Sequence, residues 1–263
     1  MEWLIVVAVV VLGVQAWAWL MQERMLFFPQ PVLTTTHLPA NAASYEVVAA
    51  EGTHLRGWIV KGTTVPAPVV IYFGGNAEEV SWTLSELRWP REWTIVALNY
   101  RGYGASEGTP GQSALQADAL AICDAVARRE DVDSRRIVVF GRSLGTAMAV
   151  HVAAERPQRI AGAVLVSPYD SMTAIGRHHY PWLLVSVLLR HPFDAVPDAR
   201  RNRMPLLAIV GASDSIIPPE RSHALYDAWA GPKTWVAIAG ADHNDLGASD
   251  EYGQAVMRFL SER

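Results

Sequence analysis

Residues 136–150 read Arg-Ile-Val-Val-Phe-Gly-Arg-Ser-Leu-Gly-Thr-Ala-Met-Ala-Val. The apolar run Ile137–Phe140 predicts a buried strand, and the small residues of 146–154 predict a helix. Between them, Gly141-Arg-Ser-Leu-Gly145 matches the pattern G-x-S-x-G, a turn so sharp that Ser143 must take a strained backbone conformation. Glycine suits both ends of the turn because a side chain there would crowd the crossing of strand and helix. The stretch therefore predicts a nucleophile elbow, with an ordinary glycine-rich turn as the alternative.

The apolar runs around this stretch predict the rest of a sheet. The expected strands are a hairpin at 45–50 and 54–61 and runs at 68–73, 93–98, 137–140, 160–166, 205–210 and 235–239. Helical patterns occupy residues 80–89, 113–129 and 254–260. Because strands alternate with helices through the second half, the sequence predicts an α/β fold with a mostly parallel, doubly wound sheet.

The chain begins with an apolar run at residues 3–21, in which Gln15 is the single strongly polar residue. A helix of this length approaches the thickness of a bilayer's hydrocarbon core, so we expect residues 1–24 to form a single-pass transmembrane helix that anchors the protein in a membrane. A cleaved signal peptide is the alternative, because Ala16-Trp-Ala18 resembles a cleavage site, although no basic residue precedes the run. Arg24 is the nearby basic residue and favours a cytoplasmic domain.

Composition narrows the function classes. The 263 residues suit one large domain, and a formal net charge of −4 without a basic stripe gives no reason to expect a nucleic-acid partner. The single cysteine, Cys123, excludes an internal disulfide and a multi-cysteine zinc site, and its place in an apolar helical register predicts a buried thiol. Histidines 178 and 179 lack carboxylates at ligand spacing. We therefore expect neither a metal nor a cofactor, and the sequence leaves the oligomeric state open.

Two further residues complete a possible catalytic set with Ser143. Asp214 follows the predicted strand 205–210, and His243 follows the last predicted strand. The chain order serine, acid, histidine is the order in which a triad follows this elbow motif. Asp170 also follows a strand and is the competing acid. A surface-loop histidine is the competing interpretation of His243.

A glycine-rich loop follows the buried strand 68–73 and reads Gly74-Gly-Asn-Ala-Glu-Glu79. Backbone N–H groups of such a loop can face an anion. Beside an elbow, the N–H of Asn76 is the expected second donor of an oxyanion hole, together with the N–H of Leu144.

Residues 171–203 separate the Asp170 strand from the Asp214 strand and have little strand character. The apolar stretch Tyr180–Leu189 is too short to cross a bilayer and predicts a small cap helix over the site. A buried core helix is the alternative. A sharper hypothesis makes this stretch an acyl-binding wall close to the membrane.

Taken together, these motifs resemble the α/β-hydrolase superfamily along essentially the whole chain. The apolar N-terminus with Phe27-Phe-Pro29, the loop Asn99–Gly108 and the stretch Ser167–Ser171 are similar to a branch of membrane-anchored serine hydrolases related to lipases, thioesterases and protein depalmitoylases, with serine aminopeptidases as further relatives. Two positions depart from the family pattern. Gly74 stands where the family usually has His, which removes a side chain that would stiffen the loop, and Asn99 stands where Asp is common.

The resemblance implies an α/β-hydrolase domain over 25–263, with Ser143 as nucleophile, His243 as base and Asp214 as the acid that orients it. It implies a membrane-anchored enzyme that cleaves carboxylic esters or thioesters through an acyl-enzyme. Two alternatives remain: an aminopeptidase or amidase with the same triad, and a catalytically silent binding module tethered to the membrane.

Overall fold

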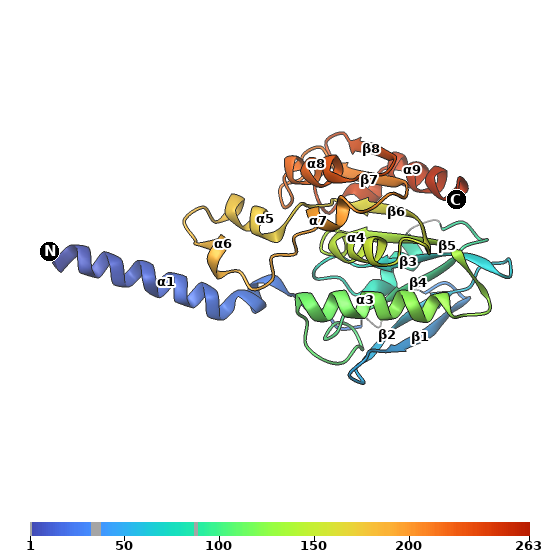
Figure 1. Cartoon of the computed structure of the whole chain (residues 1–263), viewed down its shortest axis with the longest axis horizontal. Coiled ribbons are helices and arrows are strands. Elements are labelled where there is room, and N and C mark those ends of the chain that lie inside the picture. Colours follow the sequence, from blue (N-terminus) through green and yellow to red (C-terminus); the bar gives the residue numbers. More distant parts are fainter. Residues whose placement is uncertain (1, 33–37, 87–88) are drawn as a thin grey trace.

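An eight-stranded sheet forms the centre of the computed structural model, which describes residues 2–32, 38–86 and 89–263 (Figure 1). The strand order is β1-β2-β4-β3-β5-β6-β7-β8, in which β1 and β2 pair antiparallel, β2 and β4 pair antiparallel, and all other neighbours are parallel. The strands are β1 (Ala42–Val48), β2 (His54–Val60), β3 (Ala67–Phe73), β4 (Thr94–Leu98), β5 (Val132–Arg142), β6 (Ile160–Val166), β7 (Leu206–Gly211) and β8 (Lys233–Ile238). The predicted α/β fold with a mostly parallel sheet is confirmed.

Helices cover both faces of the sheet, which explains why the central strands are apolar along their whole length. Two apolar clusters result, one on each face. The first includes side chains of α3 (Gln112–Ala127), α4 (Gly145–Glu155) and α8 (Pro219–Ala228). The second includes side chains of the 3₁₀ helix η1 (Val80–Trp82), α2 (Thr83–Glu86) and α9 (Asp250–Ser261). A second 3₁₀ helix, η2 (Leu246–Ala248), precedes α9.

Two predicted helices differ from the structure. The expected single cap helix over Tyr180–Leu189 is wrong: the cap consists of α5 (Met172–His179), a bend, α6 (Val185–Leu188) and α7 (Val196–Ala199). Pro181 lies in the bend and cannot donate to a helical hydrogen bond, so the helix ends before it. The helix expected at 80–89 is likewise shorter, comprising η1 and α2, and residues 87–88 lie outside the described residues.

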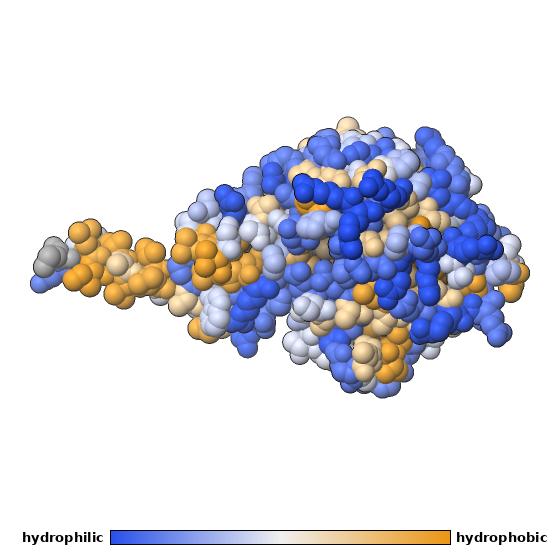
Figure 2. Space-filling view, viewed as in Figure 1, coloured by the Kyte–Doolittle hydropathy of each residue, from blue (hydrophilic) through white to orange (hydrophobic). Residues whose placement is uncertain are grey.

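Helix α1 (Glu2–Leu26) projects from the carboxyl edge of the sheet (Figure 1). It is the one helix in the described part of the chain that is long and apolar enough to cross a membrane. At about 1.5 Å per residue it is roughly 38 Å long. Its N-terminal half is exposed and apolar (Figure 2), whereas Gln15, Ala18 and Gln22 are buried.

The crossing of β3 and α4 leaves no room for a side chain at Gly145. A Cβ atom built there would lie 2.1 Å from the carbonyl oxygen of Phe73 and 2.6 Å from that of Gly74. At Gly141 it would lie 2.5 Å from the carbonyl oxygen of Gly145. All of these obstacles are backbone atoms, which cannot rotate away. The glycines of the elbow are therefore required by packing.

We predict that Gly145→Ala lowers the free energy of unfolding by about 3 kcal/mol or more, because the added methyl group forces the helix off the sheet. Gly253→Ala is the matched control, since no atom lies within 4 Å of its Cβ position in α9. Removing a helical glycine should stabilise the protein by about 0.5–1 kcal/mol. Urea unfolding of the full-length chain in detergent measures both, and equal effects of the two substitutions would contradict the packing argument.

Candidate active site

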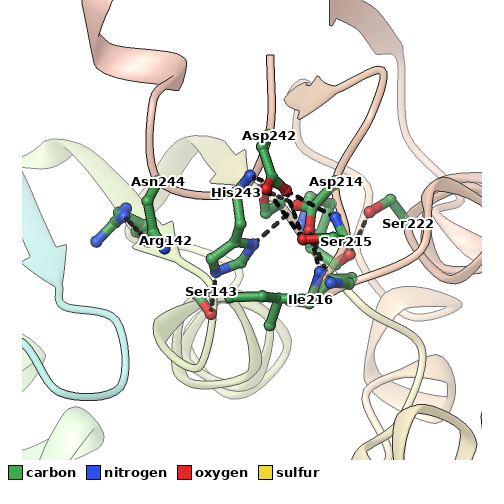
Figure 3. Close-up of polar contacts among 12 residues, drawn as sticks. Arg142, Ser143, Asp214, Ser215, Ile216, Ser222, Asp242, His243 and Asn244 are labelled. Atoms are coloured by element: carbon green, nitrogen blue, oxygen red, sulfur yellow. Dashed lines mark hydrogen bonds and ion pairs between the residues drawn. The ribbon is translucent and has the colours of Figure 1, made fainter. Parts of the chain in front are cut away.

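Three side chains from the ends of three parallel strands meet at the carboxyl edge of the sheet (Figure 3). Nε2 of His243 lies 3.0 Å from Oγ of Ser143, and Nδ1 lies 2.8 Å from Oδ2 of Asp214. A carboxylate can only accept a hydrogen bond, so Nδ1 carries the proton and Nε2 is free to accept one from the serine hydroxyl. This is the geometry that general-base activation of a serine requires.

The backbone of the elbow aims the serine. Ser143 has φ of +51°, in the left-handed region that costs a non-glycine residue energy. Its N–H donates to the carbonyl of Val166 over 2.8 Å, and the hydroxyl of Thr146 donates to its carbonyl over 2.7 Å. Leu144 comes next, immediately before the first residue of α4. The strained conformation predicted for Ser143 is therefore present and is held by hydrogen bonds on both sides.

Asp214 is buried and fully partnered. Its Oδ1 accepts the N–H groups of Ile216 and Ile217, and its Oδ2 accepts the hydroxyl of Ser167 as well as His243. Burial alone would raise the pKa of Asp214, but the hydrogen bonds from His243, Ile217 and Ser167 more than offset it and lower the pKa below its usual value. The carboxylate therefore stays ionised beside the imidazole. The role of Ser167 was not predicted from the sequence, and its φ of +47° makes it a second strained position at the site.

The competing acid, Asp170, faces a different partner. Its Oδ2 lies 3.1 Å from the Arg221 guanidinium, and its Oδ1 accepts the N–H of Ser171. Burial raises the pKa of Asp170, against the lowering effect of these partners. The structure therefore pairs His243 with Asp214.

The histidine loop is joined to the acid loop through Asp242. Oδ1 of Asp242 accepts the N–H of His243 and the N–H of Ser215, each over 2.7 Å (Figure 3). Asp245 in turn accepts the N–H of Asp242. These hydrogen bonds hold the imidazole in position relative to the carboxylate that it contacts.

The Gly74–Glu79 loop lies beside the elbow. A Cβ atom at Gly75 would lie 3.6 Å from the Cβ of Ser143. The side chain of Asn76 fixes the loop, because its Nδ2 donates to the carbonyl of Leu26 over 2.6 Å and its Oδ1 accepts the hydroxyl of Tyr103 over 2.8 Å. The two predicted oxyanion donors, the N–H groups of Asn76 and Leu144, thus belong to the two segments that meet at Ser143. Their role stays a prediction.

An ion pair that was not predicted from the sequence, with its carboxylate buried, supports the same loop. The Glu78 carboxylate accepts the N–H of Gly75 over 2.6 Å and the hydroxyl of Tyr72 over 2.7 Å, and it lies 3.1 Å from the Arg142 guanidinium. Arg142 also donates to Oδ1 of Asn244, next to His243. Burial would lower the pKa of Arg142, but the charge of Glu78 raises it overall. Glu78 therefore stiffens the Gly74–Glu79 loop beside the elbow.

Asn99, the second departure from the family pattern, is buried against the same loop. Its Nδ2 donates to Glu79 over 2.9 Å, and its Oδ1 accepts the N–H of Val80 over 3.0 Å. An aspartate there would set two carboxylates against each other, so the amide suits this chain.

A cavity of about 440 Å³ opens beside the histidine. Its lining includes His243, Arg142, Trp82, Leu246 and Tyr252. Space for part of a substrate therefore lies next to the imidazole.

One group of described residues places three possible metal ligands close together: His151, Glu155 and Asp198, whose ligand atoms lie within 4.8 Å of one another. The imidazole Nδ1 is 2.8 Å from Asp198, and the Arg201 guanidinium pairs with both carboxylates. The guanidinium already pairs with both carboxylates of this surface cluster and offsets one of their two charges, so the cluster does not indicate a metal site.

Comparison with known proteins agrees with the fold described above. Residues 68–195 match the family model described as the alpha/beta hydrolase fold. The uncharacterized protein Rv2307c of Mycobacterium tuberculosis is 35% identical over 98% of this chain and 93% of its own length. Among solved structures, an acetyl xylan esterase from Paenibacillus sp. R4 has a TM-score of 0.71 at 23% identity, covering 88% of this chain and 87% of its own. The Pyrococcus furiosus esterase Pf2001 has a TM-score of 0.68 at 16% identity, covering 90% and 97%.

We predict that Glu78→Gln lowers the free energy of unfolding by about 3 kcal/mol, because it leaves the Arg142 charge largely buried without a counter-ion. Glu107→Gln is the matched control: its ion pair with Arg56 is exposed, so it should cost at most about 1 kcal/mol. Adding Arg142→Gln to Glu78→Gln should restore part of the lost free energy of unfolding. A double-mutant cycle measured by urea unfolding tests this coupling. Strictly additive losses would mean that the two groups are not coupled.

Proposed function

Because the chain belongs to the α/β-hydrolase family, we propose that it is a serine hydrolase that cleaves carboxylic ester or thioester bonds. The observation that carries this proposal is the hydrogen-bonded series from Ser143 through His243 to Asp214, with separations of 3.0 and 2.8 Å. About nine-tenths of the chain is similar in fold to esterases of known structure, and this likeness supports the reaction class without specifying a substrate.

In the proposed reaction, Oγ of Ser143 attacks the carbonyl carbon while its proton passes to Nε2 of His243. The carbonyl electron pair moves onto oxygen, where the N–H groups of Asn76 and Leu144 stabilise it. As the oxyanion collapses, the bond to the leaving oxygen or sulfur breaks, and that atom takes the proton from Nε2. Water then attacks the acyl-enzyme by the same route and regenerates Ser143. Asp214 holds the imidazole in the required tautomer throughout.

We further propose that α1 is a retained membrane anchor. A cleaved signal peptide would be released after Ala18, yet Gln15 and Ala18 are buried against the rest of the protein. A helix that completes the folded domain is poorly suited to removal. Arg24, at the domain end of α1, favours the cytoplasmic side for the hydrolase domain.

We predict that a fluorophosphonate labels the wild-type protein at Ser143 and that Ser143→Ala abolishes labelling. Asp214→Asn should lower kcat for p-nitrophenyl acetate by about 10³–10⁴, because the amide favours the wrong imidazole tautomer. Asp170→Asn, the matched control, removes the competing acid and should change kcat only a few-fold. If the folded wild-type protein does not react, or if Asp170→Asn is the more damaging change, the proposed site is wrong.

The proposed membrane anchor leads to a separate prediction. Full-length protein should remain with membranes through an alkaline carbonate wash, because an apolar helix about 38 Å long resists extraction. Intact-mass analysis of that material should show a chain that retains residues before Ala18. A soluble product beginning at residue 19 would instead establish a signal peptide.

A further inference from the structure

The C-terminal half of α1 lies along the cap (Figure 1), where two glutamines join the two elements. Nε2 of Gln15 donates to the carbonyl of Trp182 over 3.2 Å, and Oε1 accepts the N–H of Leu184 over 3.0 Å. Nε2 of Gln22 donates to the carbonyl of Leu188 over 3.1 Å, and Oε1 accepts the N–H of Arg190 over 2.7 Å. Each amide therefore bridges the backbone of two cap residues.

These contacts suit an apolar surrounding. Gln15 and Gln22 lie about two helical turns apart and so share one face of α1. The bend and the short helix of the cap leave backbone groups that no regular element satisfies, and in lipid each such group would cost several kcal/mol. The glutamine side chains supply the missing partners. The cap tip, residues 181–190, is therefore suited to a position beside α1 where water is scarce.

The length of α1 also indicates that the cap tip lies in the membrane. In α1, residues 2–14 precede the first hydrogen bond to the cap and span only roughly 20 Å, short of a hydrocarbon core of about 30 Å. A helix that spans the bilayer must therefore carry the cap tip into the membrane. The tip is suitably apolar: Trp182, Leu184 and Val187 are 61%, 60% and 81% exposed. In Figure 2, hydrophobic surface continues from α1 onto the body of the protein beside it.

Between α1 and the cap lies an apolar cavity of about 190 Å³. Its walls include Ala18, Met25 and Leu26 of α1 and Met172, Leu183 and Leu188 of the cap. Since a protein cavity of about 150 Å³ can hold benzene, this one can hold a chain segment of about six to eight carbons.

Two hydrogen bonds join the walls of this cavity to loops of the proposed active site. The carbonyl of Leu26, a wall residue, accepts Nδ2 of Asn76 in the loop beside Ser143. Nε2 of His179, another wall residue, lies 2.9 Å from the carbonyl of Ile216, whose own N–H donates to Asp214. The walls are therefore fastened to both loops that flank the nucleophile.

We propose that this cavity binds the acyl chain of an ester drawn from the lipid bilayer, so that α1 is a wall of the substrate site as well as an anchor. The proposal rests on the hydrolase function above and specifies its substrate class: esters or thioesters with an acyl chain of medium or greater length. In this proposal an apolar chain enters from the membrane beside the cap tip and lies between α1 and the cap, with its carbonyl group directed to Ser143.

The test uses the full-length protein in detergent with p-nitrophenyl acetate and p-nitrophenyl octanoate. Ala18→Phe fills the cavity from α1 and should lower the ratio of kcat/KM for octanoate to that for acetate at least about tenfold, because several methylenes lose their site. Ala16→Phe is the matched control: it adds the same ring to the same helix at an exposed position, so the ratio should stay as in the wild type. Leu183→Ala enlarges the cavity and should raise the ratio of dodecanoate to octanoate.

The outcomes separate the two proposals. If a short-chain fluorophosphonate labels wild-type Ser143 but neither Ala18→Phe nor Leu183→Ala shifts the chain-length ratios, the acyl site is wrong and the hydrolase remains. An equal shift in Ala16→Phe also overturns the acyl site, since the effect then comes from α1 in general. If the wild type neither reacts with the fluorophosphonate nor cleaves any ester, both proposals fail together.

Discussion

The close approach of α4 to β3 at Gly145 is the constraint on which the rest of this structure depends. With the helix backbone this near the carbonyl of Phe73, the chain has no freedom to relax the turn, and Ser143 is forced to φ of +51°. The same contact brings the loop after β3 beside the serine, so the candidate nucleophile and the candidate oxyanion donors are positioned by one crossing. Strain at Ser143 persists because buried strands on both sides of β5 hold the turn in place.

Around that crossing, the buried carboxylates of Asp214 and Glu78 each have several hydrogen-bond partners. Asp214 accepts hydrogen bonds from two backbone N–H groups, a hydroxyl and the imidazole, and Glu78 accepts from a backbone N–H, a phenol and a guanidinium. A buried carboxylate with fewer partners would take up a proton, and Asp214 could then no longer stabilise an imidazolium. These hydrogen bonds therefore hold the loops in place and keep Asp214 ionised, as the proposed chemistry requires.

Much of this could be predicted from the sequence because the signals are local. Buried parallel strands are continuous apolar runs, the elbow is a five-residue pattern, and Asp214 and His243 each follow a strand. The contributions of Glu78 and Ser167 could not be predicted, since an ordinary loop residue becomes a buried partner only through contacts distant in sequence. The cap helix at Tyr180–Leu189 was predicted wrongly because apolar content was taken for helical content. There the stretch is apolar because it faces α1 and the exposed surface, and Pro181 interrupts it.

Helix α1 shows how one local inconsistency can reveal a tertiary role. A transmembrane anchor has no need of polar residues at Gln15 and Gln22, and each amide in hydrocarbon would be costly without partners. Both side chains are buried and bonded to the cap backbone, so the polar positions are explained by docking and not by membrane crossing. Where a sequence breaks a rule that its surroundings impose, a compensating contact elsewhere is the first explanation to seek. Here that contact joins α1 to the cap of the folded domain, and the apolar cavity that we assign to the substrate lies between the two elements.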